Sequence, residues 1–508
     1  MNRQTNILEY LDNIILEFSG KTCYANESEE FSFQYVYDNA RSIGTFLAQK
    51  GHIKTPVVVF MKKHPKMIVS FFGVVCSGSY YIPIDEEMPA FRIEMIFKDL
   101  LPQAVICDDS TRSLIGNFNY GGNVYTYDEM TQTSPHDDIL KQIRLKSIDT
   151  DPVYIVFTSG STGVPKGVVA CHRSLIDYIE NLSEVMDLSH ETVFGNQTPF
   201  YVDACLKDIY PTIKCGATAY VIPKQYFMFP LQLIEFLNKF KINTICWVAS
   251  ALTLTSGLGA FDKVIPKYLH TIAACSEVLP MKQLMLWQKN LPHARFFNLY
   301  GPTEATGVSC YYEVDRILSL EDVLPIGRPF RNTEIILLNE QNELAASDES
   351  GEICIRGTGL TLGYYNAFDK TNEVFVQNPL NHCYSELIYR TGDIGKYNDR
   401  GDLVFLSRKD YQIKHMGHRI ELGEIEMVFN NMPGMFMASC IFDDDNKKIV
   451  LYYVGGISKT EIIEYGRQIL PRFMIPNLIE QLEIMPLTTN GKINRKLLKE
   501  SYNNQKRS

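Results

Sequence analysis

The fold of this chain is decided by the stretch YIVFTSGSTGVPKG, which runs from Tyr154 to Gly167. Its first four residues form a short apolar run that is typical of a buried strand, and the rest is a loop rich in Gly, Ser and Thr. A helix is expected next, because Leu175, Ile179 and Leu182 recur at helical spacing. Strand, loop and helix in this order are typical of α/β proteins, so we predict a layered α/β body.

The same alternation appears nearer the N-terminus. Val36, Ala40, Ile43 and Leu47 recur at the spacing of one helical face. Residues 57–60 then form an apolar run that predicts a short buried strand. The body is therefore expected to contain both sheets and helices from its beginning.

The last part of the chain follows a different pattern. We place a domain boundary at Asp410, so that residues 1–409 form a large multi-subdomain body and residues 410–508 form a small mobile α+β domain. Within the small domain, residues 449–454 predict a strand. Ser458 and Glu461 form a capping box, which predicts the start of a helix.

Composition excludes several classes of protein. The 508 residues are 45% hydrophobic and 21% charged, which is typical of a globular protein and not of a disordered one. A net charge of -10 without a long basic run argues against a nucleic-acid partner. We recognise no signal peptide and no apolar stretch long enough to span a membrane, so we expect a cytoplasmic protein. The 12 cysteines include no Cys-x-x-Cys pair, which argues against zinc and disulfide frameworks.

The Gly/Ser/Thr loop has the composition of a phosphate-binding cradle. Glycines let the backbone approach an anion, hydroxyls add hydrogen-bond donors and a lysine supplies charge. It is not a Walker loop, because Lys166 stands between Pro165 and Gly167. A surface turn is the alternative for such a loop taken alone. The residues expected to bind phosphate are Thr158, Ser159, Gly160, Ser161, Thr162, Gly163 and Lys166.

This stretch resembles the phosphate loop of the adenylate-forming superfamily, which includes acyl-CoA synthetases, luciferases and nonribosomal peptide adenylation domains. Further stretches resemble motifs of that family in the family's order: residues 76–85, 298–306, 351–357, 389–393, 419–426 and 490–493. The resemblance covers essentially the whole chain. It implies an AMP-forming acid–thiol ligase that uses ATP and Mg²⁺.

The resemblance also implies roles for individual residues. A carboxylate and ATP repel each other, so the reaction needs positive charge at the α-phosphate. Lys492 matches the lysine that bridges the carboxylate and the α-phosphate, Thr303 a residue that contacts this phosphate, and Glu304 a ligand of Mg²⁺. A surface ion pair is the alternative for each charged residue taken alone. The other residues assigned to ATP are Asn298, Tyr300, Gly301, Arg408 and Asp393, the last of which matches the residue that holds both ribose hydroxyls.

Family members rotate the small domain between two half-reactions, and Asp410 matches the hinge of that rotation. A substitution of Lys492 is therefore expected to cripple adenylation and to spare transfer to the thiol.

Residues 198–205 resemble the specificity segment of amino-acid-activating members, in which an Asp anchors the substrate amino group. Asp203 falls on that position; the alternative is that Asp203 caps a helix starting at Ala204. Val202 and Ser276 depart from the family pattern and leave the substrate open. The other pocket positions carried over from the family are Ala204, Lys207, Trp247, Ala273, Cys275, Leu299, Gly307 and Val308.

Two pocket residues permit more than one interpretation. Lys207 would bind an acidic side chain, a phenol oxygen or an internal carboxylate, unless it reaches solvent or pairs with Asp208. Trp247 would either narrow the pocket for a small amino acid or stack on a ring such as an aminobenzoate. The sequence does not decide between these, nor does it assign a role to Cys275.

The thiol acceptor is expected to be the phosphopantetheine group of a carrier protein. No Gly-x-Asp/His-Ser attachment motif follows Lys492, so we expect a carrier in trans, as for the D-alanine–carrier protein ligases that this chain resembles. An acyl- or aryl-CoA synthetase is the nearest rival. A non-catalytic nucleotide-binding sensor is the other, but it would be expected to lack at least one of the charged motif residues.

Overall fold

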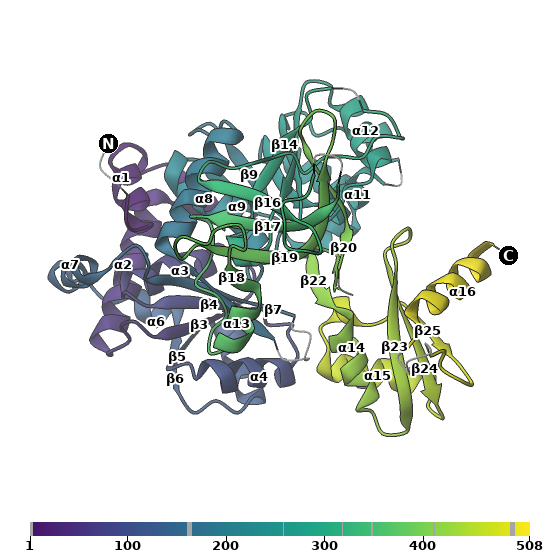
Figure 1. The fold of residues 1–508 in the computed structure, drawn as a ribbon. Helices are drawn as coiled ribbons and strands as arrows, with labels where there is room; N and C mark the ends of the chain where they lie inside the picture. The colour runs from purple at the N-terminus through teal and green to yellow at the C-terminus, as the bar shows by residue number, and fades with distance from the viewer. Residues whose placement is uncertain are drawn as a thin grey trace.

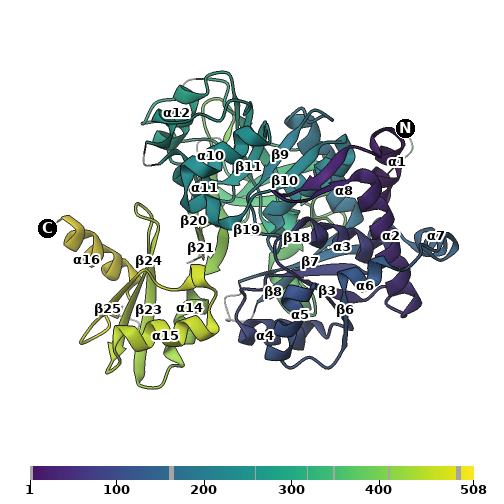
Figure 2. The ribbon, with the colours of Figure 1, turned by 180° about the vertical axis from the view of Figure 1, so that it is seen from behind.

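The computed structural model describes residues 4–159, 165–257, 259–316, 318–346, 349–409, 412–487 and 493–507. Figure 1 shows a large body, coloured from purple to green, and a smaller unit, coloured yellow-green to yellow, that carries the C-terminus. The same division is visible from behind in Figure 2. None of the helices that the structure describes is both long and apolar enough to cross a bilayer.

The N-terminal sheet is accompanied by helices α2 (Phe33–Gln49), α3 (Pro65–Cys76), α4 (Ala90–Leu100), α5 (Asp109–Arg112), α6 (Tyr127–Thr131) and α7 (Asp137–Lys146). Helix α7 packs on α2 and α3 and lies beyond α2 in Figure 1. The strands of this sheet follow the order β6 (Asn123–Thr126), β5 (Ala104–Cys107), β3 (Pro56–Phe60), β4 (Tyr80–Ile84), β7 (Pro152–Thr158) and β8 (Lys166–Cys171). Strand β3 is buried throughout, as is typical of a parallel strand covered on both faces. Val36, Ala40, Ile43 and Leu47 of α2 are fully buried in the main core, so the predicted helix and strand are confirmed.

The phosphate-loop region differs from our expectation in one respect. We expected the loop to lead directly into a helix, but Lys166 begins β8, which pairs antiparallel with β7. Helix α8 (His172–Val185) follows only after this strand, and its Leu175, Ile179 and Leu182 are buried as predicted. The loop therefore joins two strands. The apolar residues 168–170, which form the middle of β8, were the sequence signal for it.

The central sheet runs in the order β15 (Arg328–Pro329), β14 (Cys310–Glu313), β13 (Arg295–Tyr300), β12 (Thr271–Cys275), β11 (Thr244–Val248), β9 (Val193–Asn196), β10 (Thr218–Val221), β1 (Thr22–Ala25) and β2 (Glu30–Ser32). It is parallel from β1 to β13 and antiparallel at both edges. The carboxyl ends of its parallel strands are where ligands bind in open α/β sheets. Its helices are α1 (Leu8–Phe18), α8, α9 (Leu206–Cys215), α10 (Pro230–Lys239), α11 (Ala249–Ser256) and α12 (Met281–Asn290).

An antiparallel sheet completes the body. Its order is β16 (Thr333–Leu338), β17 (Gly351–Gly357), β19 (Leu387–Tyr397) and β18 (Phe375–Gln377), with β20 (Leu403–Arg408) also paired to β19 and helix α13 (Phe368–Val374) leading into β18. The register of β19 and β20 places Asp393 directly opposite Arg408. Two residues assigned to ATP are therefore neighbours because of strand pairing.

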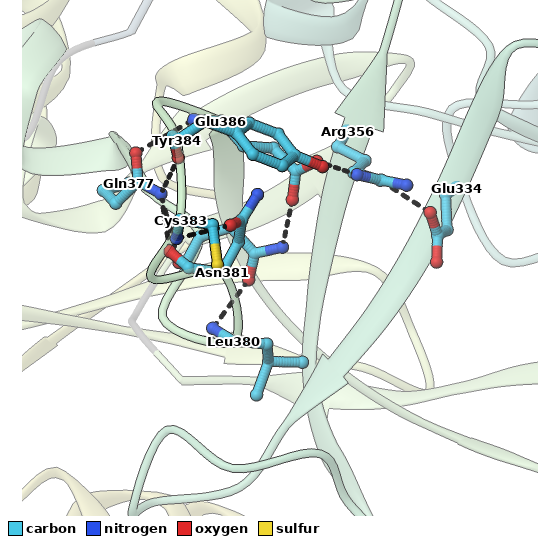
Figure 3. Close-up of polar contacts among 9 residues, drawn as sticks. Glu334, Arg356, Gln377, Leu380, Asn381, Cys383, Tyr384 and Glu386 are labelled. Carbon is cyan, nitrogen blue, oxygen red and sulfur yellow. Dashed lines mark hydrogen bonds and ion pairs between the residues drawn. The ribbon is translucent and has the colours of Figure 1, made fainter.

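Polar side chains anchor the connection from β18 to β19 (Figure 3). The Gln377 amide donates to the carbonyl oxygens of Asn381 (2.9 Å) and Tyr384 (3.1 Å). The Glu386 carboxylate pairs with Arg356 of β17, which also pairs with Glu334 of β16 (2.6 Å). These contacts tie the connection to the adjoining strands and fix the point at which β19 begins.

The smaller unit has its own core. It begins with the hairpin β21 (Gln412–His415) and β22 (His418–Glu421) and helix α14 (Leu422–Asn430), followed by the sheet β23 (Met435–Asp443), β24 (Lys448–Gly455) and β25 (Leu478–Gln481) with helices α15 (Lys459–Ile469) and α16 (Arg495–Arg507). Strand β24 and the capping box of Ser458 and Glu461 confirm two predictions. The predicted hinge, Asp410, lies outside the described residues.

Candidate active site

The β21–β22 hairpin of the smaller unit closes a cavity of about 150 Å³ against the body. The body contributes the end of β7 and the loop after β13, and the hairpin contributes Lys414, His418 and Arg419. The Ser159 hydroxyl donates to the carbonyl oxygen of Arg419 (2.5 Å) and accepts from the backbone N–H of Glu421 (3.2 Å). The start of the phosphate loop is thus bonded directly to the smaller unit. Thr158, Ser159, Gly301 and Thr303, which the resemblance assigns to ATP, lie on the cavity wall.

Glu304 lies beside this cavity and is fully buried. Its Oε2 pairs with the Arg419 guanidinium (2.6 Å), and its Oε1 accepts from the Tyr364 hydroxyl (2.6 Å). Burial alone would raise the pKa of Glu304, but Arg419, Tyr364 and Lys166 outweigh it and lower this pKa below the ordinary value. Lys166 lies 4.9 Å from the centre of the Tyr364 ring. Glu304 is therefore ionised and held by partners on two sides.

Asp393 forms a second buried carboxylate centre. Its Oδ1 pairs with Arg408, and its Oδ2 accepts from the Tyr300 hydroxyl (2.5 Å). The adjoining cavity, of about 730 Å³, is also lined by Asn298, Leu299 and Tyr300. Asp393 and Arg408 line both cavities, so the two spaces meet at this pair. A carboxylate oxygen has two lone pairs, so Asp393 can still accept from a ribose hydroxyl.

Asp203 lies on the wall of the smaller cavity. It is the first residue of the short 3₁₀ helix η2 (Asp203–Cys205), so the N-cap of η2 is Val202, and the N-cap of the following helix α9 is Cys205. Burial raises the pKa of Asp203, and Lys207 and Thr303 oppose this shift. A Cβ at Gly307 would stand 3.6 Å from the Asp203 carboxylate, so the glycine leaves space beside it. The capping alternative is therefore not supported.

Lys207 lies one helical turn beyond Asp203 and lines the same cavity. It is 2% exposed, so it does not reach solvent. Its Nζ has a weak contact with the carbonyl oxygen of Ala204 (3.5 Å), whereas Asp208 accepts two bonds from the Asn196 amide (3.0 and 2.9 Å). Burial lowers the pKa of Lys207, but Cys275 and then Asp203 offset this and raise it overall. The lysine is a buried cation that faces the cavity.

The remaining predicted pocket residues do not all reach a cavity wall. Gly307 lines the smaller cavity and Leu299 the larger one. Trp247 is fully buried in the main core, donates from its indole N–H to the carbonyl oxygen of Gly195 (2.7 Å) and packs on Phe227. The others, all buried behind the walls, are Ala204, Ala273, Cys275 and Val308.

Some predicted residues lie outside the described part of the chain. They are Gly160, Ser161, Thr162 and Gly163 of the phosphate loop, the hinge Asp410 and the catalytic candidate Lys492.

Sequence reasoning assigned no role to three residues at the site. Lys414 lies 5.5 Å from the centre of the Tyr300 ring and lines both cavities. Arg419 opens the motif at residues 419–426, so its place in that motif was a usable signal. Tyr364 carried no such signal, because its hydroxyl meets Glu304 only through the tertiary fold.

Glu304 is the carboxylate that the resemblance assigns to a metal ion. Mg²⁺ is usually held by one or two carboxylates together with phosphates and water. In the described residues no group of three or more His, Cys, Asp and Glu side chains could hold a metal. Both oxygens of Glu304 are engaged by Arg419 and Tyr364. In this arrangement of the two units, Glu304 does not fit the role of a metal ligand.

Known proteins resemble this chain in sequence. The sequence profile described as AMP-binding enzyme matches residues 12–365. Tyrocidine synthase 1 of Brevibacillus parabrevis is 31% identical over 490 residues, which cover 95% of this chain and 44% of that protein. The dimodular nonribosomal peptide synthase of Bacillus subtilis (strain 168) is 30% identical over 480 residues, which cover 92% of this chain and 20% of that protein. The chain thus spans less than half the length of these relatives.

Solved structures show the same fold. Holo-PA1221, an NRPS protein containing adenylation and PCP domains, aligns with a TM-score of 0.85 and 22% identity over 97% of this chain and 84% of that one. A double mutant of o-succinylbenzoate CoA synthetase from Bacillus subtilis aligns with a TM-score of 0.82 and 17% identity over 98% of both. The predicted α/β body with a small C-terminal domain is confirmed. The chain belongs to the AMP-binding enzyme family, and a nonribosomal peptide synthase is among its relatives.

Proposed function

We propose that this chain activates an amino acid, or an amino-substituted aryl acid, as acyl-AMP with release of pyrophosphate. It then passes the acyl group to the phosphopantetheine thiol of a separate carrier protein, in the cytosol. Asp203 is the observation that carries the proposal, because its half-buried carboxylate lies on a cavity wall, burial raises its pKa, and a cationic ligand group there would stabilise its ionised form. The ammonium group of an amino acid would supply that partner.

Each step has identifiable residues around it. In the first, a carboxylate oxygen of the acid attacks the α-phosphorus, the bond to the β-phosphate breaks and pyrophosphate leaves. Thr303 lies on the cavity wall where the α-phosphate is expected, Asp393 would accept from the ribose, and Lys492 would offset the developing charge. In the second, the thiol sulfur attacks the acyl carbonyl carbon, the thiol proton is lost and AMP leaves.

The position of the hairpin bears on which step this arrangement serves. Lys414 and Arg419 of the smaller unit occupy the cavity wall, and the backbone of β22 bonds to Ser159. The residues that follow Lys492 pack elsewhere: Arg495 pairs with Glu426 inside the smaller unit (2.5 Å). We assign the described arrangement to the transfer step and expect the smaller unit to rotate for adenylation.

The position of Lys207 narrows the class of acid substrate that we expect the pocket to bind. A buried ammonium group that faces a cavity is stabilised by an anionic ligand group, since Asp203, whose charge raises the pKa of Lys207, would be shared with the substrate ammonium and Asp208 accepts two bonds from Asn196. Asp203 would bind the substrate ammonium, and the reacting carboxylate must point toward the nucleotide. A second carboxylate on the substrate side chain is the group that would meet Lys207. The acid we favour is therefore a dicarboxylic amino acid such as glutamate or aspartate.

ATP–pyrophosphate exchange tests this function. A panel of L-, D-, acidic and aminobenzoic acids should give strong exchange with one acid, and Asp203→Asn should reduce it about a hundredfold by removing the charge at the amino group. Silence across the panel, with plain aryl and fatty acids included, would contradict the ligase function. The rate of acyl transfer should then be compared between a phosphopantetheinylated carrier protein and free coenzyme A. Faster transfer to the carrier would support the proposal, and faster transfer to coenzyme A would indicate a CoA synthetase.

The second carboxylate is tested with matched substrates. Glutamate, glutamine and norvaline have similar length and differ in the terminal group. Wild type should favour glutamate over glutamine, and Lys207→Met should remove that preference by about tenfold to a hundredfold, because the only difference is a charge-assisted hydrogen bond. An unchanged preference in the variant would mean that Lys207 does not contact the substrate.

A further inference from the structure

The β9–η2 segment, residues 196–203, connects the central sheet to the candidate pocket. Asn196 is the last residue of β9, and Asp203 is the first residue of η2. Residues 197–202 between them belong to no helix or strand. Backbone groups outside regular structure need side chains or water as hydrogen-bond partners. The place of Asp203 on the cavity wall therefore depends on the side chains that anchor this segment.

Lys63 anchors the start of the β9–η2 segment. It lies in the connection from β3 to α3, and its Nζ donates to the carbonyl oxygens of Asn196 (3.1 Å) and Gln197 (2.8 Å). The same ammonium group lies 5.7 Å from the centre of the Phe200 ring. Phe200 is itself buried and packs against Phe71 of α3. One side chain from the N-terminal sheet thus contacts three residues of the segment.

Asp208 of α9 holds Asn196 from the other side. The Asn196 side-chain amide donates to both carboxylate oxygens of Asp208 (3.0 and 2.9 Å), and both residues are buried. Burial raises the pKa of Asp208, and the bonds from Asn196 and then the charge of Lys63 oppose this shift. Burial lowers the pKa of Lys63, and the charge of Asp208 opposes this most. The cation and the anion therefore stabilise each other while they hold the backbone and the side chain of Asn196.

We propose that Lys63 is a positioning residue that fixes the β9–η2 segment and thereby sets the position of Asp203 for the ammonium group of the substrate. Lys63 is not among the described residues that line the two cavities, so it acts through the segment and not by touching the acid. Without it, two backbone carbonyl oxygens lose a charged donor and the segment gains alternative positions. This role rests on the proposed function, since the ammonium group at Asp203 belongs to that function.

Hydrogen–deuterium exchange of the full chain tests the anchoring without any substrate. The backbone N–H groups of Val202 and Cys205 donate to carbonyl oxygens within the segment and report on its order. Lys63→Met should raise the exchange rate of these amides about tenfold or more, because a charge-assisted hydrogen bond is lost. Lys63→Arg keeps the charge and the donors and should stay within about threefold of wild type. Unchanged exchange in Lys63→Met would overturn the proposal, and Lys63→Gln replaces that variant if it does not fold.

Lys66→Met is the matched control. Lys66 lies on α3, close to Lys63 in the chain, and pairs with the exposed Asp128 (3.0 Å), so its loss removes a nearby lysine without touching the β9–η2 segment. The exchange rates of the segment should stay within about twofold of wild type. A rise equal to that of Lys63→Met would assign the effect to a loosened α3 and would overturn the positioning role.

Pyrophosphate exchange then measures the position of Asp203, with glutamate and with glutarate, which lacks the amino group. Lys63→Met should raise KM for glutamate about tenfold, reduce the preference for glutamate over glutarate by a similar factor and leave KM for ATP within about twofold. An unchanged preference, or an equal rise in both KM values, would overturn the positioning role. Failure of wild type with every acid that carries an amino group would instead contradict the proposed function, and deuterium exchange tells the two failures apart because it needs no acid.

Discussion

Two buried carboxylates at this site are built alike but differ in the origin of their partners. Asp393 is held by the hydroxyl of Tyr300 and the guanidinium of Arg408. Glu304 is held by the hydroxyl of Tyr364 and the guanidinium of Arg419. The first arginine comes from β20 of the body, next to β19 in the same sheet, and the second comes from the smaller unit.

The ion pair of Asp393 with Arg408 is therefore permanent, whereas the ion pair of Glu304 with Arg419 depends on the position of the smaller unit. Strand pairing places Arg408 opposite Asp393, so this contact does not depend on the position of the smaller unit. The contact of Arg419 with Glu304 exists only while the β21–β22 hairpin is packed on the body. Loss of the Asp393 centre should therefore affect both half-reactions, and loss of the Arg419 contact only one.

Lys492→Ala should cause the largest loss of activity. It should slow adenylation and spare transfer, whereas a substitution of Arg419 should slow transfer and spare adenylation. Both residues belong to the C-terminal part of the chain, but we assign Lys492 to adenylation and Arg419 to transfer. Loss of the lysine should lower pyrophosphate exchange about a thousandfold, as expected when a preorganised charge at the transition state is removed. Transfer from a preformed acyl-adenylate, measured in a single turnover, should stay within about threefold. Equal losses in both assays would show that one arrangement serves both steps.

Asp393→Asn should weaken both half-reactions together, by about a hundredfold. The amide would remove the negative charge that pairs with Arg408 and would bind the ribose less strongly in either arrangement. Pyrophosphate exchange measures the loss in adenylation, and single-turnover transfer measures the loss in the second half-reaction. A loss confined to one assay would contradict the view that the Asp393 centre is permanent.

The elements of the fold were predictable where their patterns were local. The helical face of α2 and the apolar run of β3 follow directly from residue spacing, and both are buried as expected. Strand β8 was missed because its short apolar run follows a Gly/Ser/Thr loop that was expected to open a helix. Periodicity alone does not reveal that β7 and β8 pair antiparallel, since the partner of a strand is set by the whole sheet.

The site was predictable through its motifs but not through its contacts. Thr303, Asp393 and Asp203 were named from sequence, and they line the cavity. The link between Arg419 and Glu304 joins residues far apart in the chain and depends on how two units pack. Trp247 was placed in the pocket by position, but its indole N–H bonds to a backbone carbonyl in the core. Position along the chain does not tell which face of a strand is turned to the cavity.

Arg419→Gln should slow transfer about thirtyfold, because one charge-assisted hydrogen bond to a buried carboxylate is lost. Pyrophosphate exchange should stay within about twofold, since Glu304 has no need of Arg419 while the smaller unit is rotated away. Arg419→Lys should recover part of the transfer rate. If the variant is equally slow in both assays, Arg419 is needed in both half-reactions, as we expect for Arg408, and its contact with Glu304 is not specific to transfer.

The pH dependence of transfer should show the smallest effect, and it concerns the same packing surface. His418 stacks on Phe473 of the smaller unit (3.6 Å between ring centres) and lies near Tyr201 of the body. Burial lowers the pKa of His418 to about 3, and the facing His415, Arg92 and Lys224 add to this.

An exposed imidazole has an ordinary pKa near 6.5, so the unpacked state takes up a proton before the packed state does. Packing is therefore fully favoured above about pH 6.5 and is progressively lost as the pH falls from there toward 3. Transfer should slow about fivefold between pH 7 and 5.5, while exchange changes less. His418→Phe keeps a stacked ring without a titrating group and should flatten the transfer profile; if the slope persists, another group controls packing.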